Sequence, residues 1–548
     1  MGMAGLYVGL SGIQTNSNSL NTTANNLSNV NTTGYVRQQV VNRDIGYNFV
    51  GTTSATTTGQ KGLGVSIQTI NHVRDVFLDT AYRKEVGRQG FYNKLYDAVY
   101  EIQTQMGETD FITGIGFQKN ITEFLESLHE VAKTPGDSTA RSALVQSAAQ
   151  FIDSAQTIYK GLVNYQDNLN EEIKEVVGRI NEIGATLVEI NRNIAKIEGG
   201  GKETASDLRD TRDLLLDELA SYCKISYNED DTGAVSVSIE GVKFADKLGY
   251  TEMGLDVFTG TSLVRPIWPA LNNEDVYSYS EVISTGKNTD IGGLRGLLVA
   301  RGNIVPTYLD AENVSSSTST LVNVIANFDK LVSNMAMEIN NIFCPETKIT
   351  AADGTEYTVL DMENAPLTSD GQFGFELFTR NFCDRYNVQT IDGQEYYVRN
   401  DVNTFGNAST YTIMNLSVNE DIIQDYSRIP LTTQAGLDDY EKAEELVSLF
   451  SKKLLKYNDR LESLNFEMFY ESIVNDLANT GKVYQSMSDN EDVLTHQLDS
   501  QRLEVMGVSS EEELSNMIKY QQAYNASSRY VNVIDSMLQT LIMQMGAG

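Results

Sequence analysis

The chain has 548 residues, 41% of them hydrophobic, and a formal charge of −33 at pH 7. One hydrophobic core rarely organises so long a chain, so we expect three or four domains, some of them discontinuous in sequence. The negative charge argues against nucleic acid and anionic lipid as ligands, because both require a cationic surface that displaces counterions. No uninterrupted apolar run approaches the roughly 18 to 20 residues that cross a bilayer, so we expect no membrane insertion.

The first 20 residues lack the features of a cleaved secretory signal peptide. They contain no basic region, no compact apolar stretch and no small-residue cleavage site. We therefore expect a protein that either stays in the cytoplasm or leaves the cell by another export route. Three cysteines, odd in number and far apart, favour buried or reduced thiols over a disulfide pair: Cys223, Cys344 and Cys383.

In residues 1–50, an apolar residue recurs at every seventh position from Leu6 to Leu27, which predicts an N-terminal coiled-coil segment. The main row is Leu6, Ile13, Leu20 and Leu27, with Leu10 in an offset row. The other faces carry asparagine, serine and threonine, whose side chains compete for backbone hydrogen bonds and weaken a helix. We therefore expect this helix to be marginal alone and to order when a partner covers its stripe.

Helical periodicity then returns in three separated stretches, which we assign to one discontinuous bundle domain: residues 60–221, 291–345 and 437–506. In the first stretch one helix is expected to begin near Asp75, and another at a cap formed by Asp137 and Ser138. The most regular pattern, with apolar residues three and four positions apart, runs from Leu169 to Ile197 and ends at three glycines.

Two stretches between these parts are expected to be β-rich insertions that project from the helical core: residues 222–290 and 346–436. In the first, two alternating runs flank a turn at Asp231 to Gly233. In the second, three Asp-Gly pairs beside alternating or aromatic runs predict tight hairpins: Asp353-Gly354, Asp370-Gly371 and Asp392-Gly393. The expected fold is mainly α, with terminal coiled-coil helices, a discontinuous helical bundle and one or two β-rich outer domains.

Residues 507–548 mirror the N-terminal segment as a second coiled-coil helix. Gly507 is expected to end the preceding helix, and Ser509 or Ser510 to cap the next one, with Glu512 or Glu513 reaching back. An apolar stripe follows at spacings of three, four and seven residues, which keep its members on one helix face: Leu514, Met517, Tyr524, Val531, Leu538, Ile542 and Met545.

The matching stripes predict that the two terminal helices pack together. Residues 1–50 and 514–548 each carry one net positive charge, so the residues between them hold all of the excess negative charge. Nearly neutral ends can pack against copies of themselves without the repulsion that keeps the acidic middle soluble. The two ends are therefore the expected assembly surfaces.

Candidate catalytic and metal-binding motifs fail at their key positions. The stretch from Asn228 to Ile239 resembles a calcium loop, but isoleucine stands where a bidentate carboxylate is needed, so a hairpin turn is favoured. His129-Glu130 suggests a zinc-peptidase helix, yet Lys133 stands where the second histidine belongs. We therefore predict no catalytic residue, no cofactor and no metal, and hence no enzyme.

Two further features each leave two interpretations open. Trp268 lies between two prolines and is favoured as a packed loop anchor over a carbohydrate platform. The asparagine-rich face of the first helix is either an ordinary solvated face or a neutral lining for a channel that unfolded protein passes through: Asn16, Asn18, Asn21, Asn25, Asn26 and Asn29.

Residues 25–38, NNLSNVNTTGYVRQ, resemble the N-terminal signature of the flagellar axial proteins, the family of rod, hook and hook-associated proteins. In this motif Gly34 is expected to supply the turn that releases the chain from the coiled coil. Further stretches narrow the resemblance to the hook-associated protein 1 family: residues 62–65 with 74–78, 135–145, 207–219 and 517–524. The resemblance covers about residues 1–222, 290–340 and 440–548 and leaves the β-rich insertions unmatched.

The resemblance implies an extracellular structural subunit at the junction of hook and filament, exported unfolded by the flagellar type III apparatus. The implied partners are other copies in a ring, hook protein, hook-associated protein 3, a cytoplasmic export chaperone and the export machinery. The alternatives are another axial subunit, of hook or distal rod, or a junction subunit whose β-rich insertion is an adhesin or a hydrolase.

The resemblance also implies roles for residues at both ends of the chain. Axial assembly falls to Leu6, Leu10, Ile13, Leu20, Leu27, Asn25, Asn26, Asn31, Gly34 and Tyr35 at the N-terminal end. Assembly together with chaperone binding falls to Leu514, Met517, Tyr520, Tyr524, Val531, Leu538 and Ile542 at the C-terminal end.

Overall fold

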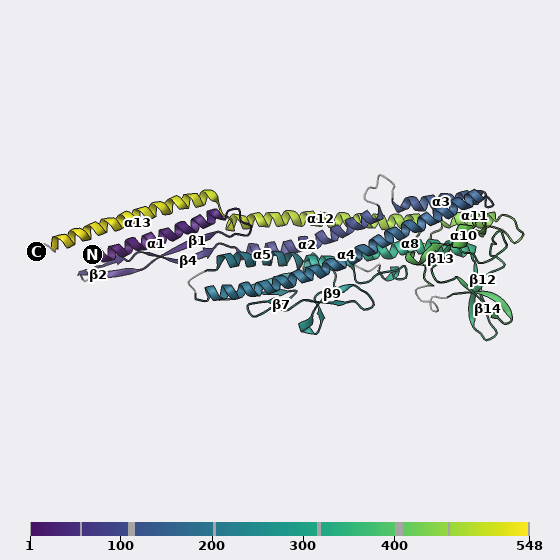
Figure 1. The fold of residues 1–548 in the computed structure, drawn as a ribbon, viewed down its shortest axis with the longest axis horizontal. Coiled ribbons are helices and arrows are strands. Elements are labelled where there is room, and N and C mark those ends of the chain that lie inside the picture. The colour runs from purple at the N-terminus through teal and green to yellow at the C-terminus, as the bar shows by residue number, and fades with distance from the viewer. Residues whose placement is uncertain are drawn as a thin grey trace.

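The chain forms a long rod with both termini at the same end (Figure 1). The computed structural model describes residues 2–54, 57–107, 116–200, 204–314, 319–400, 409–458 and 461–545. Helices α1 (Gly2–Ser28) and α13 (Ser510–Met545) form the terminal end, with a β-ribbon beside them; a helical body follows, and small β-sheets lie along it and at its far end. The expected class, mainly α with β-rich insertions, is confirmed.

The body is a bundle of helices drawn from three separated parts of the chain, as predicted. Its main helices are α2 (Val76–Met106), α3 (Phe117–Lys133), α4 (Ser138–Glu198), α5 (Ser206–Tyr222), α6 (Gly293–Arg301), α8 (Thr320–Phe343), α11 (Tyr440–Leu449) and α12 (Phe466–Met506), with short α7 (Ala311–Val314). A further short helix, α10 (Glu420–Gln424), belongs to the second β-rich stretch. The domain boundaries assigned from the sequence stay a prediction.

The predicted helix starts are confirmed by their caps. Asp75 accepts hydrogen bonds from the backbone N–H groups of Phe77 and Leu78, and Asp137 accepts one from Thr139. The two periodic stretches that follow Asp137 form a single helix, α4, of 61 residues. At 1.5 Å per residue α4 is about 90 Å long and runs along most of the body.

Aromatic side chains join these helices into one core. Phe117 of α3 meets Phe328 of α8 at 4.9 Å between ring centroids, and Phe124 of α3 stacks on Phe151 of α4 at 5.5 Å. All four side chains are almost completely buried. Because they come from segments far apart in sequence, the bundle forms only when the separated parts of the chain come together.

The first β-rich region lies along α4. It contains the sheet of β5 (Ile225–Glu229), β6 (Val235–Ile239) and β7 (Val242–Ala245), and the sheet of β8 (Gly254–Val257), β9 (Val264–Trp268) and β10 (Glu274–Asp275). The predicted turn between β5 and β6 is confirmed. Asn191 of α4 exchanges two hydrogen bonds of 2.9 Å with the backbone of Val235, so this sheet packs on the helix where a projecting insertion was expected.

The structure tests three predictions made from the sequence: the turn that resembles a calcium loop, the role of Trp268 and the state of the cysteines. Asp230 accepts hydrogen bonds from the backbone of Thr232 and Ala234, which confirms a hairpin turn in place of a calcium loop. Trp268 is 1% exposed, so it is a packed anchor and presents no platform to a carbohydrate. The cysteines are all free and buried, as predicted.

The second β-rich region projects from the far end of the rod (Figure 1). Strands β11 (Glu346–Thr350), β12 (Glu356–Leu360), β15 (Gln394–Arg399) and β14 (Tyr386–Ile391) form one sheet in that order, and β13 (Phe378–Arg380) pairs with β16 (Leu416–Val418). A further short pair, β17 (Leu455–Lys456) with β18 (Ser463–Leu464), lies between α11 and α12, where only helix was expected. Hairpins at Asp353-Gly354 and Asp392-Gly393 are confirmed. The hairpin at Asp370-Gly371 is wrong, because no strand follows this turn until Phe378, whose strand pairs with β16.

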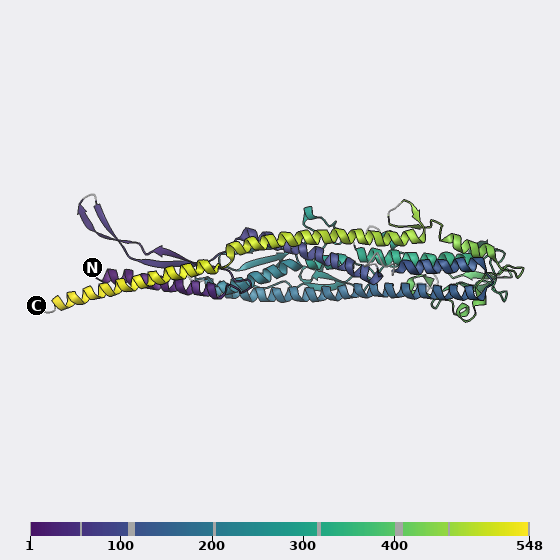
Figure 2. The same ribbon diagram turned by 90° about the horizontal axis from the view of Figure 1, so that it is seen from above.

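An antiparallel ribbon that the sequence did not predict connects α1 to α2. Strand β1 (Gln38–Asp44) pairs with β4 (Val65–His72), and β2 (Tyr47–Ser54) pairs with β3 (Thr57–Gly62). The ribbon runs beside the terminal helices, and its outer hairpin stands away from the rod (Figure 2). Strand β1, QQVVNRD, does not alternate apolar and polar residues, so the period-two signal of a half-buried strand is missing.

Candidate assembly site

Helices α1 and α13 pack against each other in antiparallel orientation through a seam of glycines. A Cβ atom on Gly9 would lie 2.5 Å from Cγ2 of Val531, and one on Gly12 would lie 2.7 Å from the hydroxyl of Ser527. At Gly5 the nearest atoms, from Tyr530 and Ile534, are 3.3 Å away. The missing side chains let the two backbones approach closely, and the expected pairing of the terminal helices is present.

The predicted leucine row lies beside this seam and not at its centre. Leu6, Ile13, Leu20 and Leu27 are half-buried, and Leu10 is 58% exposed. Leu6 and Ile13 each follow a seam glycine in the sequence, so the row is displaced by one residue around the helix. The spacing of Gly5, Gly9 and Gly12, four and then three residues apart, was the available signal for the true seam.

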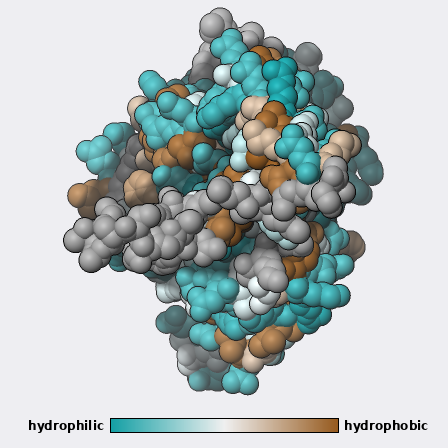
Figure 3. Space-filling view, turned by 90° about the vertical axis from the view of Figure 1, so that its left-hand side faces the viewer, coloured by the Kyte–Doolittle hydropathy of each residue, from teal (hydrophilic) through white to brown (hydrophobic). Residues whose placement is uncertain are grey.

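On α13 the predicted stripe divides into two groups. Met517, Tyr520, Val531 and Leu538 are half-buried, while Leu514, Tyr524 and Ile542 are 48%, 38% and 70% exposed. Further large apolar side chains of α13 are also exposed: Ile518, Tyr530, Val533, Met537, Leu541 and Met543. In Figure 3, which faces this end of the rod, apolar residues lie among polar ones on the surface. The terminal pair therefore leaves much of its apolar surface uncovered.

The polar face of α1 holds the ribbon. The backbone N–H of Val65 donates to Oγ of Ser11 at 3.2 Å, and Oγ1 of Thr15 donates to the Val65 carbonyl at 3.4 Å. The amide of Asn26 donates to the carbonyl of Gln38 at 2.9 Å and accepts from its N–H at 3.1 Å. Asn26 is 1% exposed, and its side chain bonds within the same chain. Asn25 and Asn31 are exposed.

The segment after α1 returns to the body through Gly34, Tyr35 and Val36. Gly34 has the predicted turn conformation, with φ of 75°, and a Cβ there would lie 2.6 Å from the side chain of Leu214 on α5. The Tyr35 hydroxyl donates to Asn26 at 2.8 Å. Burial, together with the nearby carboxylates of Asp210 and Asp207, raises the pKa of Tyr35 to about 12. These contacts hold the segment that follows α1 directly against α5.

Arg37 connects this segment to the bend between α12 and α13. Its backbone N–H donates to the carbonyl of Met506, the last residue of α12, at 2.9 Å. Its guanidinium donates to Glu512 and Glu513 in the first turn of α13, each at 2.8 Å. Glu513 is 2% exposed, so this ion pair is partly buried.

Below the terminal pair, ionisable side chains from four segments form a cluster that we call the polar joint. It consists of His72, Arg74, Asp79, Arg83, Asp210, Asp213, Asp217 and Arg502. Asp210, Asp213 and Asp217 lie three and four residues apart on one face of α5. Their partners come from the end of the ribbon, from α2 and from α12, so the joint fixes all of these elements to α5.

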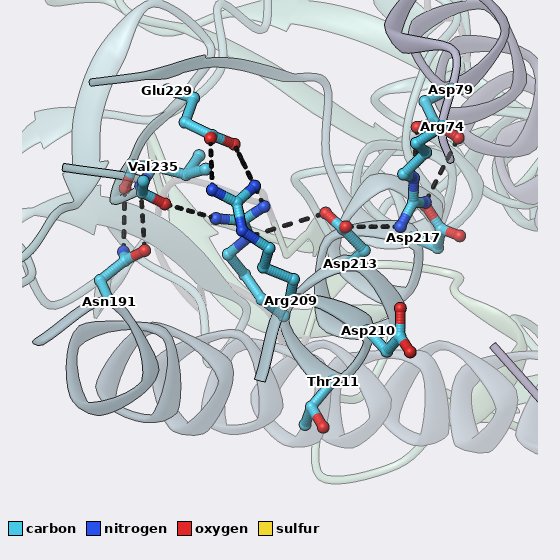
Figure 4. Close-up of polar contacts among 12 residues, drawn as sticks. Arg74, Asp79, Asn191, Arg209, Asp210, Thr211, Asp213, Asp217, Glu229 and Val235 are labelled. Carbon is cyan, nitrogen blue, oxygen red and sulfur yellow. Dashed lines mark hydrogen bonds and ion pairs between the residues drawn. The ribbon is translucent and has the colours of Figure 1, made fainter. Parts of the chain in front are cut away.

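The distances in the polar joint are those of strong charge-assisted bonds. Arg502 donates from Nε to Asp79 and from Nη2 to Asp217, both at 2.8 Å. Arg83 reaches Asp217 at 2.6 Å, and Nε2 of His72 lies 2.5 Å from Asp210. Figure 4 shows Arg74 between Asp79 and Asp213, and it shows next to Asp213 the pair that Arg209 of α5 forms with Glu229 of β5.

The sequence resemblance had marked residues 74–78 and 207–219, but it assigned no role to the charged residues of the polar joint. The spacing of the three aspartates on α5 indicates a charged face that needs partners. The identity of those partners depends on contacts between residues more than 100 positions apart, such as Arg83 with Asp217 and Asp79 with Arg502.

The polar joint is expected to weaken in acid. Burial raises the pKa of Asp213, but Arg74, Arg212 and Arg83 lower it by more, so the net shift is below the usual value of 3.8. A carboxylate whose pKa is lower in the folded chain stabilises the fold above the unfolded pKa and loses this effect as the pH falls through the folded pKa. Replacing Asp213 with asparagine should therefore reduce the free energy of unfolding most at neutral pH, and less below about pH 4. Urea denaturation of both chains at pH 7 and pH 3 measures this, and a difference that does not change with pH would contradict it.

The described residues offer little for other chemistry. None of their His, Cys, Asp and Glu side chains form a group of three or more that could hold a metal ion. His72 belongs to the polar joint, and His129 and His496 lie on the surface. Among the described helices, none combines the length and apolar character needed to span a membrane.

Three family models match the chain. The flagellar hook-associated protein FlgK helical domain matches residues 101–350, the flagellar basal body rod FlgEFG protein C-terminal model matches 499–545, and the flagella basal body rod protein model matches 6–35. The last two matches fall on the helices that pair at the terminal end, and the first falls on the body.

Curated relatives match along almost their whole length. Flagellar hook-associated protein 1 of Bacillus subtilis is 27% identical over 538 residues, with 96% of each chain covered. The protein of the same name from Salmonella typhimurium is 22% identical over 587 residues, covering 97% of this chain and 98% of the relative. A solved structure titled as the flagellar hook junction protein FlgK from Burkholderia pseudomallei aligns with 77% of this chain and 99% of its own, at 12% identity and a TM-score of 0.47.

Proposed function

The chain belongs to the family of flagellar hook-associated protein 1, and on that premise we propose that its terminal helix pair assembles it between hook and filament. It is a structural subunit of the bacterial flagellum. The observation that carries the assembly mechanism is the uncovered apolar surface of α1 and α13 at the end of the rod where both termini lie.

Hydrophobic burial drives the proposed assembly. Exposed apolar side chains such as Val533, Met537 and Ile542 gain free energy when a neighbouring copy removes them from water, at about 25 cal/mol for each Å² buried. The terminal segments are close to neutral, while the rest of the chain is strongly acidic. Copies can therefore associate at this end and keep their acidic bodies apart, which favours a ring with the terminal pairs inside.

The remaining partners follow from the position in the flagellum. Hook protein would lie below the ring and hook-associated protein 3 above it. The chain would leave the cell unfolded through the type III export apparatus and fold outside. The exposed stripe of α13 favours an export chaperone that shields this helix beforehand, because an uncovered apolar surface invites aggregation.

The role we propose is mechanical and involves no catalysis. The alternative of a hydrolase or adhesin in the first β-rich region is disfavoured, because Trp268, its proposed binding platform, is buried in the core. A hook or distal-rod subunit is disfavoured because the body is a long helical bundle whose model match is to the hook-associated protein FlgK.

Deletion of the gene and complementation with variants tests the proposal. Without the chain, filaments should be absent from hooks and flagellin should appear as monomer in the medium. Complementation with Val533→Asp should fail, because the new charge cannot be buried between copies. The matched control is Val282→Asp, which alters a valine of the body that is 70% exposed and should restore filaments. Normal filaments in the deletion strain, or with Val533→Asp, would contradict the proposal.

A further inference from the structure

The terminal end is joined to the body by two short crossings of the chain. One is the link from β4 to α2, residues 73–75, and the other is the bend from α12 to α13, residues 507–509. Only three residues separate a helix of 41 residues from one of 36. The direction of α13 is therefore decided at this bend.

Gly507 gives the bend its shape. It has extended backbone angles, φ −72° and ψ 156°, and its N–H still donates to the carbonyl of Leu503. A Cβ at this position would lie 2.3 Å from that carbonyl oxygen, so glycine is required. The bond ties Gly507 to α12, and the N–H of Glu513 bonds to the carbonyl of Ser509 at 2.9 Å to start α13.

Arg37 contacts both sides of this bend. Its backbone bonds to the end of α12 at Met506, and its guanidinium bonds to two carboxylates at the start of α13. Among the backbone hydrogen bonds of the described residues none joins α12 directly to α13 across the bend. Glu513 is almost fully buried, and without Arg37 its carboxylate would be buried without a counter-charge.

We infer that Arg37 is a positioning residue that sets the angle between α12 and α13, and with it the direction of the terminal pair relative to the body. Without the guanidinium, the carboxylate of Glu513 is stabilised only when it becomes solvated. Rotation of α13 about residues 507–509 would expose it to water. Helix α13 is about 54 Å long, so a tilt of about 10° would move its tip by about 9 Å, close to the diameter of a helix. The importance of this angle for ring assembly rests on the proposed function, whereas the angle itself does not.

Distance measurements between two spin labels on the full chain test this inference. One label replaces Thr211 on α5 and the other replaces Asn525 on α13, both exposed positions. The labelled chain with Arg37 intact should give one narrow distance distribution. Arg37→Gln should broaden this distribution about twofold or shift its centre, because the closed arrangement loses its advantage over tilted ones. Arg37→Lys keeps the charge but not the fork that reaches two carboxylates, and should give an intermediate width.

The matched control is Arg43→Gln, which removes the same charge from an exposed position of β1 and should leave the distribution unchanged. The labels are attached through cysteines introduced at positions 211 and 525. The chain without these two cysteines, treated with the same label, checks that the buried native thiols take up none. The inference would be overturned if Arg37→Gln left the distance distribution unchanged, or if the labelled chain with Arg37 intact gave a distribution as broad as that of Arg37→Gln. Either result would leave the assembly proposal standing, while assembly of Val533→Asp would defeat that proposal without touching the angle.

Discussion

Replacing Arg502 with methionine is expected to lower the free energy of unfolding by about 3 kcal/mol, because it breaks two buried ion pairs of the polar joint and leaves Asp79 and Asp217 with one arginine partner each. Arg502 is 4% exposed and Asp79 is equally buried. The side chain also lies 4.0 Å from the ring centroid of Tyr82, a contact that methionine keeps only in part. Urea denaturation followed by circular dichroism at pH 7 measures the loss.

The matched control is Arg179→Met. Arg179 also pairs with a carboxylate through two bonds, to Glu218 at 2.8 and 3.0 Å, but it lies on the surface of α4. Solvent screens this pair, so its removal should change the free energy of unfolding by no more than about 1 kcal/mol. Equal losses in the two variants would show that burial does not determine the strength of the joint.

Leucine at position 9 is expected to separate α1 from α13. Its Cβ alone would lie 2.5 Å from Val531 and 3.1 Å from the Tyr530 ring, so the helices must move apart. Overpacking of this kind costs about 1 to 3 kcal/mol, which exceeds the gain of somewhat under 1 kcal/mol that leucine brings to a helix over glycine. Because α1 is rich in weak helix formers, it should lose its order once the pair opens.

Hydrogen exchange on the full chain measures this effect region by region. In Gly9→Leu the amides of α1 should lose protection while those of α4 keep it. Gly178→Leu is the matched control, because Gly178 also lies in a helix but has nothing within 4 Å of a Cβ, and it should be neutral or slightly stabilising. Retained protection of α1 in Gly9→Leu would contradict the glycine seam.

The features that the sequence predicted well are those that depend on near neighbours. A cap such as Asp75 acts on residues two and three positions away, and an Asp-Gly turn such as Asp392-Gly393 joins strands that touch it directly. Both carry their physical cause within a few residues. The continuity of α4 was missed because its apolar pattern is less regular before Leu169, although no proline interrupts it.

The features that were missed depend on distant partners or on the absence of a side chain. An apolar row at heptad spacing predicts a seam, but it cannot reveal that Gly5 and Gly9 allow a closer approach than Leu6 does. The pairing of Arg37 with Glu512 spans 475 positions, and nothing near Arg37 in the sequence indicates it. The assembly role of the two ends stays a prediction, and the contacts of Arg37 that orient them become visible only in three dimensions.

The free, buried cysteines have a consequence for chemistry outside the cell. Burial raises the pKa of Cys223 and of Cys344 to about 12, so at neutral pH almost none of either thiol is in the reactive thiolate form. Exchange with other disulfides needs that thiolate and access to it, and the fold denies both. A chain that refolds in an oxidising medium thus reaches its native state without any redox step, and once folded these two thiols are protected from covalent cross-linking to its neighbours.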